Sequence, residues 1–280
     1  MLNFFTRFFF PKEIVVKKGA IQRLKFLGFD KPILLFSNSA EKNGTVELVQ
    51  KMYPEIELLK IKSSEPRISD IRNYRNFEKN DGVIAIGGGS VLDTAKLLIT
   101  KTISDQNIEE IRPFTLDANK NNKPFFVAIP TTVGSGSESD GVAVFEHKKL
   151  KLPIVSDHLV PDLVILDSGL VNKLPLNILI TTSLDAFSHG FESYFSKISN
   201  EFSKMLAKSS CLNIITVLQN FEEDHLKHEK LLYSSYFAGL AQSTTSVGII
   251  HAISHVISPK VKLSHGHINS LLIPHVIRLY

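Results

Sequence analysis

The chain has 280 residues, 43% hydrophobic and 21% charged, which is the composition of a globular protein and excludes a disordered tail, a collagen-like repeat and a disulfide-built miniprotein. Cys211 is the only cysteine, so an internal disulfide is excluded and nothing supports an oxidising compartment. Lysine and arginine (32) only slightly outnumber aspartate and glutamate (28), and the charges are scattered, so no nucleic-acid partner is indicated.

The aromatic N-terminus, residues 1–13, is interrupted by Arg7 and closed by Pro11. This apolar run is too short and broken for a signal peptide. No stretch approaches the roughly 18 consecutive apolar residues of a membrane span. We therefore expect a first strand packed on a core, no membrane partner and a cytoplasmic protein.

Short apolar runs alternate with helical patterns in the first half. Strands are predicted at residues 33–36, 56–61, 82–86, 125–129 and 164–167, and helices at 44–53, 68–79 and 91–101. Such alternation predicts βαβ units and a mostly parallel sheet.

Helical periodicity replaces the strand pattern in the second half. Helices are predicted at residues 175–195, 200–220, 231–246, 249–257 and 267–280. This change predicts two domains, an α/β domain over residues 1–165 and an all-helical domain over residues 166–280.

A glycine loop, GGGSVLDTAK at residues 87–96, lies between a predicted strand and a predicted helix. Consecutive glycines let peptide N–H groups approach an anion, and the helix N-terminus adds partial positive charge. Ser90 and Asp93 fit a capping box. The arrangement predicts a loop that binds a pyrophosphate. Its glycine spacing is neither that of GxGxxG nor that of a P-loop. The alternative is a tight turn that binds no ligand.

A second polar loop, TTVGSGSE at residues 131–138, follows the predicted strand 125–129. Small hydroxyl residues and glycines at the carboxyl end of a parallel strand are typical of the ligand crevice in open α/β sheets. A solvated loop is the alternative.

Histidines and one aspartate form two pairs with helical spacing, Asp185 with His189 and His251 with His255, and His265 follows after Pro259. Residues four apart share a helix face, so converging pairs predict a divalent metal site. The helix around Asp185 is otherwise apolar or small, and a buried carboxylate favours a nearby cation. A hydrogen-bonded core aspartate with surface imidazoles is the alternative. The remaining histidines are expected to be solvated: His147, His158, His225 and His228.

These motifs, in this order, resemble those of the iron-containing (group III) alcohol dehydrogenase family over nearly the whole chain. The matching segments are residues 10–20, 87–96, 130–138, 161–167, 183–194 and 251–267. The resemblance implies a Rossmann-like α/β domain that binds NAD(P), a helical domain that holds a metal, and a homodimer.

The resemblance also implies roles for single residues. The implied metal ligands are Asp185, His189, His251 and His265, and His255 is implied as a catalytic proton relay. The implied cofactor contacts are Gly87, Gly88, Gly89 and Ser90 at the pyrophosphate, Asp93 nearby, Thr131, Thr132 and Ser135 along the adenosine and nicotinamide, and Lys151.

The implied reaction interconverts a small alcohol and its aldehyde or ketone by hydride transfer. The metal acts as a Lewis acid on the substrate oxygen. One carboxylate and three neutral imidazoles suit Fe²⁺ or, alternatively, Zn²⁺.

The chain departs from the family pattern at several positions. Ser37 stands where the family often has an aspartate that binds the adenine ribose. Without that carboxylate a 2′-phosphate is not repelled, so the coenzyme can be NADP as well as NAD. Ser264 replaces a common proline, and His267 makes an uncommon HGH, which hints at a phosphonate- or sugar-aldehyde subgroup. The family continues with further helices beyond the segment matching residues 272–276, so we expect a helical domain shortened relative to the family.

Two other functions stay open. A dehydroquinate-synthase-like lyase shares the fold and uses NAD with Zn²⁺ without net NAD(P)H turnover, although Ala95 and Lys96 favour the dehydrogenase. The second is a truncated, catalytically inert protein that binds cofactor or metal without turnover.

Overall fold

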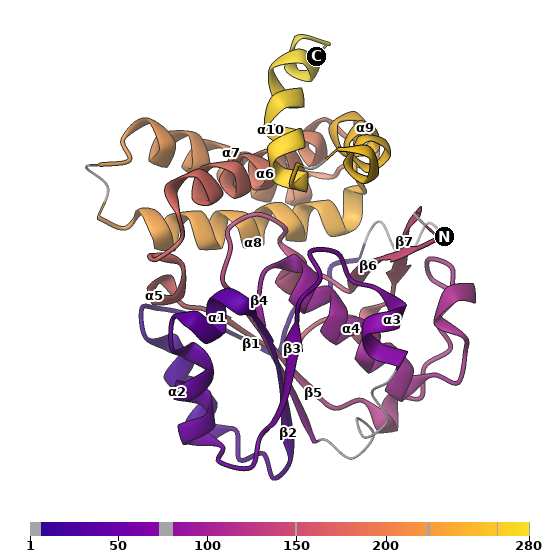
Figure 1. The fold of residues 1–280 in the computed structure, drawn as a ribbon. Helices are drawn as coiled ribbons and strands as arrows, with labels where there is room; N and C mark the ends of the chain where they lie inside the picture. The colour runs from indigo at the N-terminus through magenta and orange to yellow at the C-terminus, as the bar shows by residue number, and fades with distance from the viewer. Residues whose placement is uncertain (1–6, 73–80, 149, 223–224, 262, 280) are drawn as a thin grey trace. The chain divides into compact units, whose positions relative to one another are not determined.

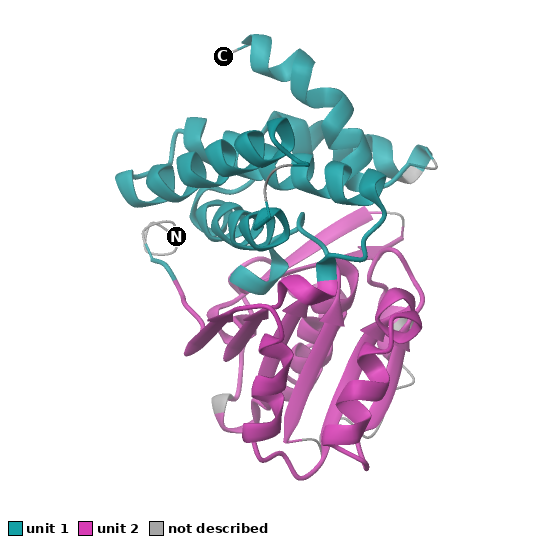
Figure 2. Ribbon diagram, turned by 90° about the vertical axis from the view of Figure 1, so that its left-hand side faces the viewer, with its two compact units in different colours: residues 1–8, 132–139, 171–280 teal, residues 9–131, 140–170 magenta. Residues whose placement is uncertain are grey.

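The structure, a computed structural model, describes residues 7–72, 81–148, 150–222, 225–261 and 263–279. The chain forms two compact units (Figure 2). Unit 1 comprises residues 1–8, 132–139 and 171–280, and unit 2 comprises residues 9–131 and 140–170. The expected N-terminal strand falls partly on residues 1–6, outside the described part. Residues 7–12 form no strand, and the first strand begins at Glu13.

Unit 2 contains a six-stranded parallel sheet in the order β1-β8-β5-β4-β2-β3. Its strands are β1 (Glu13–Val16), β2 (Pro32–Ser37), β3 (Glu57–Ile61), β4 (Gly82–Gly87), β5 (Phe125–Pro130) and β8 (Leu163–Leu166). The apolar runs of β4 and β8 are buried along their whole length, as expected for strands covered on both faces. The predicted parallel α/β architecture is confirmed.

Helices cover both faces of this sheet, with α1 and α2 on one side and α3 and α4 on the other (Figure 1). The helices of unit 2 are α1 (Asn38–Lys42), α2 (Thr45–Met52), α3 (Ile68–Arg72) and α4 (Gly89–Ile103), with 3₁₀ helices at Ala20–Phe26, Ile108–Glu110, Lys120–Asn122 and Asp157–Leu159. The predicted helix at residues 68–79 is seen as far as Arg72; residues 73–80 lie outside the described part.

An antiparallel hairpin, β6 (Val142–His147) and β7 (Leu150–Val155), was not predicted from the sequence. Side chains of α4 hold it: Asp93 Oδ2 accepts the N–H of Val144 at 3.1 Å. The buried Lys96 donates to Asp140 Oδ1 at 2.9 Å and to the carbonyl of Val142 at 2.7 Å.

The predicted capping box of Ser90 and Asp93 is wrong. Helix α4 begins at Gly89 with Gly88 as its N-cap, and no side chain caps it. Ser90 therefore lies inside the first turn, and the carboxylate of Asp93, one turn further on, is directed to the hairpin.

Unit 1 is helical, as predicted. Its main helices are α6 (Leu176–Phe195), α7 (Glu201–Gln219), α8 (Lys227–Thr245), α9 (Ile249–Ile257) and α10 (His265–Val276), with 3₁₀ helices at Ser137–Ser139, Ser258–Lys260 and Ile277–Leu279; the short α5 (Ser168–Val171) spans the change of unit. Helix α9 ends just before Pro259, which cannot continue it. Ser264, the residue that departs from the family pattern, caps α10 by accepting the N–H of His267.

Helices α6, α7 and α8 pack on one another, and α10 packs on α6 and α9. A Cβ on Gly190 of α6 would lie 2.9 Å from Cys211 Sγ of α7, so glycine permits this close helix crossing. The core of unit 1 gathers Leu179, Ile214, Leu231, Ala238 and Ile250, among others. Within the described residues, no helix is both long and apolar enough to cross a membrane.

Candidate metal centre and nucleotide-binding loops

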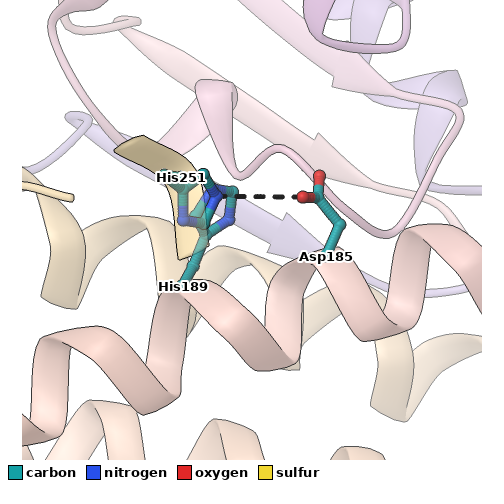
Figure 3. Close-up of side chains that lie close together, drawn as sticks. All are labelled: Asp185, His189 and His251. Atoms are coloured by element: carbon teal, nitrogen blue, oxygen red, sulfur yellow. Dashed lines mark ion pairs between the residues drawn. The ribbon is translucent and has the colours of Figure 1, made fainter. Parts of the chain in front are cut away.

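Asp185, His189 and His251 converge in unit 1 (Figure 3). Each offers one ligand atom, and these atoms lie within 4.8 Å of one another. Asp185 and His189 come from successive turns of α6, and His251 comes from the first turn of α9. All three side chains are buried, which excludes a solvated surface cluster. The fold therefore brings together three of the groups that helical spacing predicted.

His265 and His255 lie beside this cluster. The His265 ring, at the start of α10, is centred 5.4 Å from the His251 ring and 5.4 Å from the His255 ring. His255, one turn after His251, is centred 6.4 Å from it. The structure thus gathers one carboxylate and four imidazoles from three helices, a donor set that fits Fe²⁺ or Zn²⁺. Which of them bind a metal stays a prediction.

The cluster favours an ionised Asp185 and a neutral His251, as the pKa of each shows. Burial acts to raise the pKa of Asp185, but the imidazoles of His189, His265 and His251 and a hydrogen bond from Asn269 outweigh it, and the pKa lies below its usual value. Burial, together with His189, holds the pKa of His251 well below its usual value. A neutral imidazole keeps the lone pair that a metal needs.

Glu192 contacts the cluster and was not predicted from the sequence. Its buried carboxylate accepts His251 Nδ1–H at 2.6 Å and the backbone N–H groups of Gly248 at 3.0 Å and Ile250 at 2.5 Å. Because Nδ1 carries the proton, Nε2 of His251 presents its lone pair toward Asp185, 3.9 Å away. Carboxylates in this position orient metal-binding histidines. The signal was available: Glu192 follows His189 by three residues, on the same helix face.

Asn269 is the second missed residue. It lies on α10, four residues after His265, and is fully buried. Its Nδ2 donates to Asp185 Oδ1 at 2.6 Å and lies 3.1 Å from His251 Nε2 and 3.2 Å from His265 Nε2. One amide thus connects three of the four residues implied as metal ligands.

Two glycines allow the three helices to meet at the cluster. A Cβ on Gly248 would lie 2.6 Å from Glu192 Oε1, and a Cβ on Gly266 would lie 2.9 Å from the carbonyl oxygen of Thr181 and 3.3 Å from Asp185 Cβ. A side chain at either position would push α9 or α10 away from α6. The close approach therefore positions His251, His265 and Asn269.

Replacing Glu192 by glutamine is expected to weaken metal binding about 10–100-fold, the range typical when a residue that orients a metal-binding histidine is changed. The amide offers one acceptor oxygen where three N–H groups now converge on two. A chelator-competition titration with Zn²⁺ measures the change. An affinity equal to that of the wild type would show that Glu192 only caps α9.

The glycine loop lies at the point of the unit 2 sheet where ligands of open α/β folds bind. The chain runs from β2 outward to β3, then crosses back to β4 on the other side of β2. Such a reversal of strand order forms a crevice at the carboxyl edge of the sheet. Ser37 ends β2, and residues 87–90 span the end of β4 and the start of the 15-residue helix α4. Phe36 pairs with Ile86, so Ser37 and the glycine loop lie next to each other at this reversal of strand order.

The second loop begins beside the first. Gly87 pairs with Pro130 across β4 and β5, and the N–H of Thr131 donates to the carbonyl of Gly87 at 2.9 Å. Thr132 and Ser135, the other predicted residues of this loop, belong to unit 1 and are half-buried. The structure therefore brings Ser37, Gly87 and Thr131 to one sheet edge.

The other predicted residues have described partners. Ser37 caps α1 by accepting the N–H of Ala40 at 3.2 Å. Lys151, in β7, forms an ion pair with Glu65 at 2.9 Å. Among the histidines expected to be solvated, His225 is exposed. The other three, His147, His158 and His228, are half-buried, and the first two lie near Glu109 and Asp157.

Comparison with known proteins places both units in one family. Residues 11–168 match the family model described as iron-containing alcohol dehydrogenase, and residues 179–280 match that of the C-terminal part of the Fe-containing alcohol dehydrogenase family.

Curated relatives and solved structures agree. The NAD-dependent methanol dehydrogenase of Bacillus methanolicus is 30% identical over 97% of this chain and 75% of its own length. The NADPH-dependent butanol dehydrogenase of Clostridium saccharobutylicum is 29% identical over 97% of this chain and 73% of its own. The structure of an iron-containing alcohol dehydrogenase from Thermococcus thioreducens superposes with a TM-score of 0.84 at 26% identity, covering 98% of this chain and 76% of that one. The chain belongs to the iron-containing alcohol dehydrogenase family.

Proposed function

We propose that this protein is a metal-dependent, NAD(P)-linked oxidoreductase that interconverts a small alcohol and its aldehyde or ketone. The observation that carries the proposal is the buried cluster of Asp185, His189 and His251, with Glu192 fixing the tautomer of His251, in a chain of this family. In the oxidative direction, alcohol and NAD(P)⁺ become carbonyl compound, NAD(P)H and a proton.

Asp185, His189, His251 and His265 would hold the metal, Fe²⁺ or alternatively Zn²⁺. When bound, it supplies a Lewis acid for the substrate oxygen. Asp185 would supply the negative charge that a buried cation requires, and the imidazoles would supply nitrogen lone pairs, of which that of His251 is available because its pKa is held low. His255, beside His251 and His265, would accept or return the hydroxyl proton of the substrate.

The nucleotide would bind on residues 87–90 and 131–135, with Ser37 at the adenine ribose. The N-terminus of α4 directs backbone N–H groups and partial positive charge to the pyrophosphate. Asp93 acts indirectly by joining α4 to the β6–β7 hairpin, which carries Lys151. Lys151 would reach the cofactor from its ion pair with Glu65. In this proposal residues 1–165 form the nucleotide-binding domain and residues 166–280 the metal-binding domain.

Two further features are proposed from the family resemblance: a homodimer and a cytoplasmic location. The coenzyme is left as NAD(P), because the relatives include an NAD-dependent and an NADPH-dependent enzyme.

The test is anaerobic purification, metal analysis and an absorbance assay with NADH or NADPH over a panel of small aldehydes, with Fe²⁺ or Zn²⁺ added. We expect metal-dependent oxidation of the reduced cofactor that is lost in the Asp185→Ala, His265→Ala double variant. Metal and nucleotide binding without turnover on any aldehyde would favour a lyase or an inert binding protein. Absence of metal binding would overturn the assigned site.

Replacing Ser37 by aspartate is expected to lower the affinity for NADPH about tenfold or more, because a carboxylate at the ribose repels a 2′-phosphate. The affinity for NADH should hold or rise, and α1 should keep its cap because aspartate also caps helices. Fluorescence titration with each reduced cofactor measures both affinities.

Asn107→Asp is the matched control, because it adds the same charge at another cap position of unit 2. It should change neither affinity. Equal loss of NADPH affinity in both variants would show a general charge effect, and unchanged affinities in Ser37→Asp would place the ribose elsewhere.

A further inference from the structure

The side-chain amide of Asn269 has an unusual set of neighbours. Its nitrogen lies 2.6 Å from Asp185 Oδ1, 3.1 Å from His251 Nε2 and 3.2 Å from His265 Nε2. Its oxygen, Oδ1, is buried and accepts no hydrogen bond within the described residues. A purely structural asparagine uses both ends of its amide. Here only the nitrogen end is used, and all its partners belong to the candidate metal centre.

The orientation of the amide follows from its neighbours. Turning it over would bring an amide oxygen to within 2.6 Å of a carboxylate oxygen, which is repulsive. The nitrogen has two N–H donors and accepts nothing: one N–H is directed to Asp185 Oδ1, and the other is shared between the Nε2 atoms of His251 and His265, which are therefore acceptors. Their Nδ1 atoms then carry the protons and donate to Glu192 Oε2 at 2.6 Å and to Ser254 Oγ at 2.9 Å.

The lone pairs that receive the Asn269 amide are therefore those with which these residues would bind a metal. A lone pair cannot accept an N–H and coordinate a cation at once. We propose that Asn269 is a placeholder in the metal centre: its amide holds Asp185, His251 and His265 together before metal arrives, and a divalent metal displaces it on binding. This inference rests on the proposed function, because it requires the metal site.

A placeholder has two physical consequences. Before metal is bound, it satisfies a buried carboxylate that would otherwise lack a donor, so the cluster stays assembled. Binding the metal then requires breaking those contacts, so the affinity is lower than the same ligands would give without Asn269. The residue thus keeps the binding site assembled but makes metal binding weaker.

The experiment compares the full chain with its Asn269→Ala variant. Ser210→Ala is the matched control, because it removes a buried hydrogen bond, Ser210 Oγ to the carbonyl of Ser234 at 2.7 Å, in the same helical unit but between α7 and α8. Zn²⁺ affinity is measured by chelator competition, and thermal unfolding is followed after chelation and with saturating Zn²⁺.

In Asn269→Ala we expect the chelated protein to melt about 3 °C lower and the Zn²⁺-loaded protein to melt close to the wild type. The Zn²⁺ affinity should rise about tenfold, as expected for losing a competing charge-assisted hydrogen bond. Ser210→Ala should lower both melting temperatures alike and leave the affinity unchanged. The visible spectrum of the Co²⁺-loaded variant should match that of the wild type, because the displaced amide is not a ligand.

Asn269→Asp is the second variant, to be used if Asn269→Ala does not fold without metal. Its carboxylate cannot donate and stands next to Asp185, so the chelated form should be destabilised and the Zn²⁺-loaded form, purified with metal, should fold. Equal destabilisation of both forms in either variant, weaker Zn²⁺ binding in Asn269→Ala, or an altered Co²⁺ spectrum would overturn the placeholder while leaving the metal site intact. A wild-type chain that binds no divalent metal would overturn both the placeholder and the proposed function.

Discussion

Asp185→Asn is expected to lower the metal affinity about a hundredfold or more and to abolish turnover with every substrate. Asp185 is the only carboxylate among the residues assigned as ligands, and it is buried beside the imidazoles of His189 and His251. Without it, no residue assigned as a ligand carries a charge that opposes the divalent cation, and removing one partner of a buried charge pair costs about 3–5 kcal/mol. The amide is nearly isosteric, so packing on α10 is retained. Metal analysis after dialysis and chelator competition measure the loss.

Asp167→Asn is the matched control for this change. Asp167 is also buried, but it lies in unit 2, where its carboxylate accepts N–H groups of Gly19, Ile21 and Gly169. The control should lower the melting temperature and leave the metal affinity unchanged. Full metal occupancy in Asp185→Asn would remove Asp185 from the ligand set, whereas equal metal loss in both variants would indicate general unfolding.

The sequence could predict the elements whose pattern is local. The apolar runs of β2, β4 and β5 and the long helices α6 and α7 follow from hydrophobic periodicity. The β6–β7 hairpin was missed because its strand Leu150–Val155, which contains a proline, is stabilised by contacts that are distant in sequence, such as Lys151 with Glu65. Local rules also gave one wrong prediction: Ser90 and Asp93 have the spacing of a capping box, but α4 begins at Gly89, two residues before the start that this box requires.

Part of the candidate metal centre could likewise be predicted from the sequence. Helical spacing brought out Asp185, His189 and His251, because pairs four residues apart must share a face. Glu192 and Asn269 have suitable spacing too, but their roles depend on where the N-terminus of α9 and the first turns of α10 meet α6. That meeting is set by tertiary packing around Gly248 and Gly266, which periodicity does not describe.

Gly87→Ala is expected to lower NAD(P) affinity about a hundredfold while leaving the metal content unchanged. A Cβ at this position would lie 2.4 Å from Val91 Cγ2 and 2.6 Å from Val91 Cβ, so either the end of β4 or the first turn of α4 must move. That turn presents the N–H groups proposed to hold the pyrophosphate, and a displacement of about 1 Å in a binding site is enough for a hundredfold loss. Isothermal titration with NADH and NADPH measures the affinity.

Gly82→Ala separates this effect from damage to the strand. Gly82 begins β4, at the opposite end from the loop, and a Cβ there would lie 2.8 Å from the ring of Phe29. Both variants should therefore destabilise unit 2, but only Gly87→Ala should lose nucleotide affinity. Unchanged affinity in Gly87→Ala would mean that the loop is a tight turn without a ligand, and comparable losses in both would trace the effect to the sheet. A selective loss would show that the carboxyl end of β4 binds the nucleotide, as the reversal of strand order around β2 predicts.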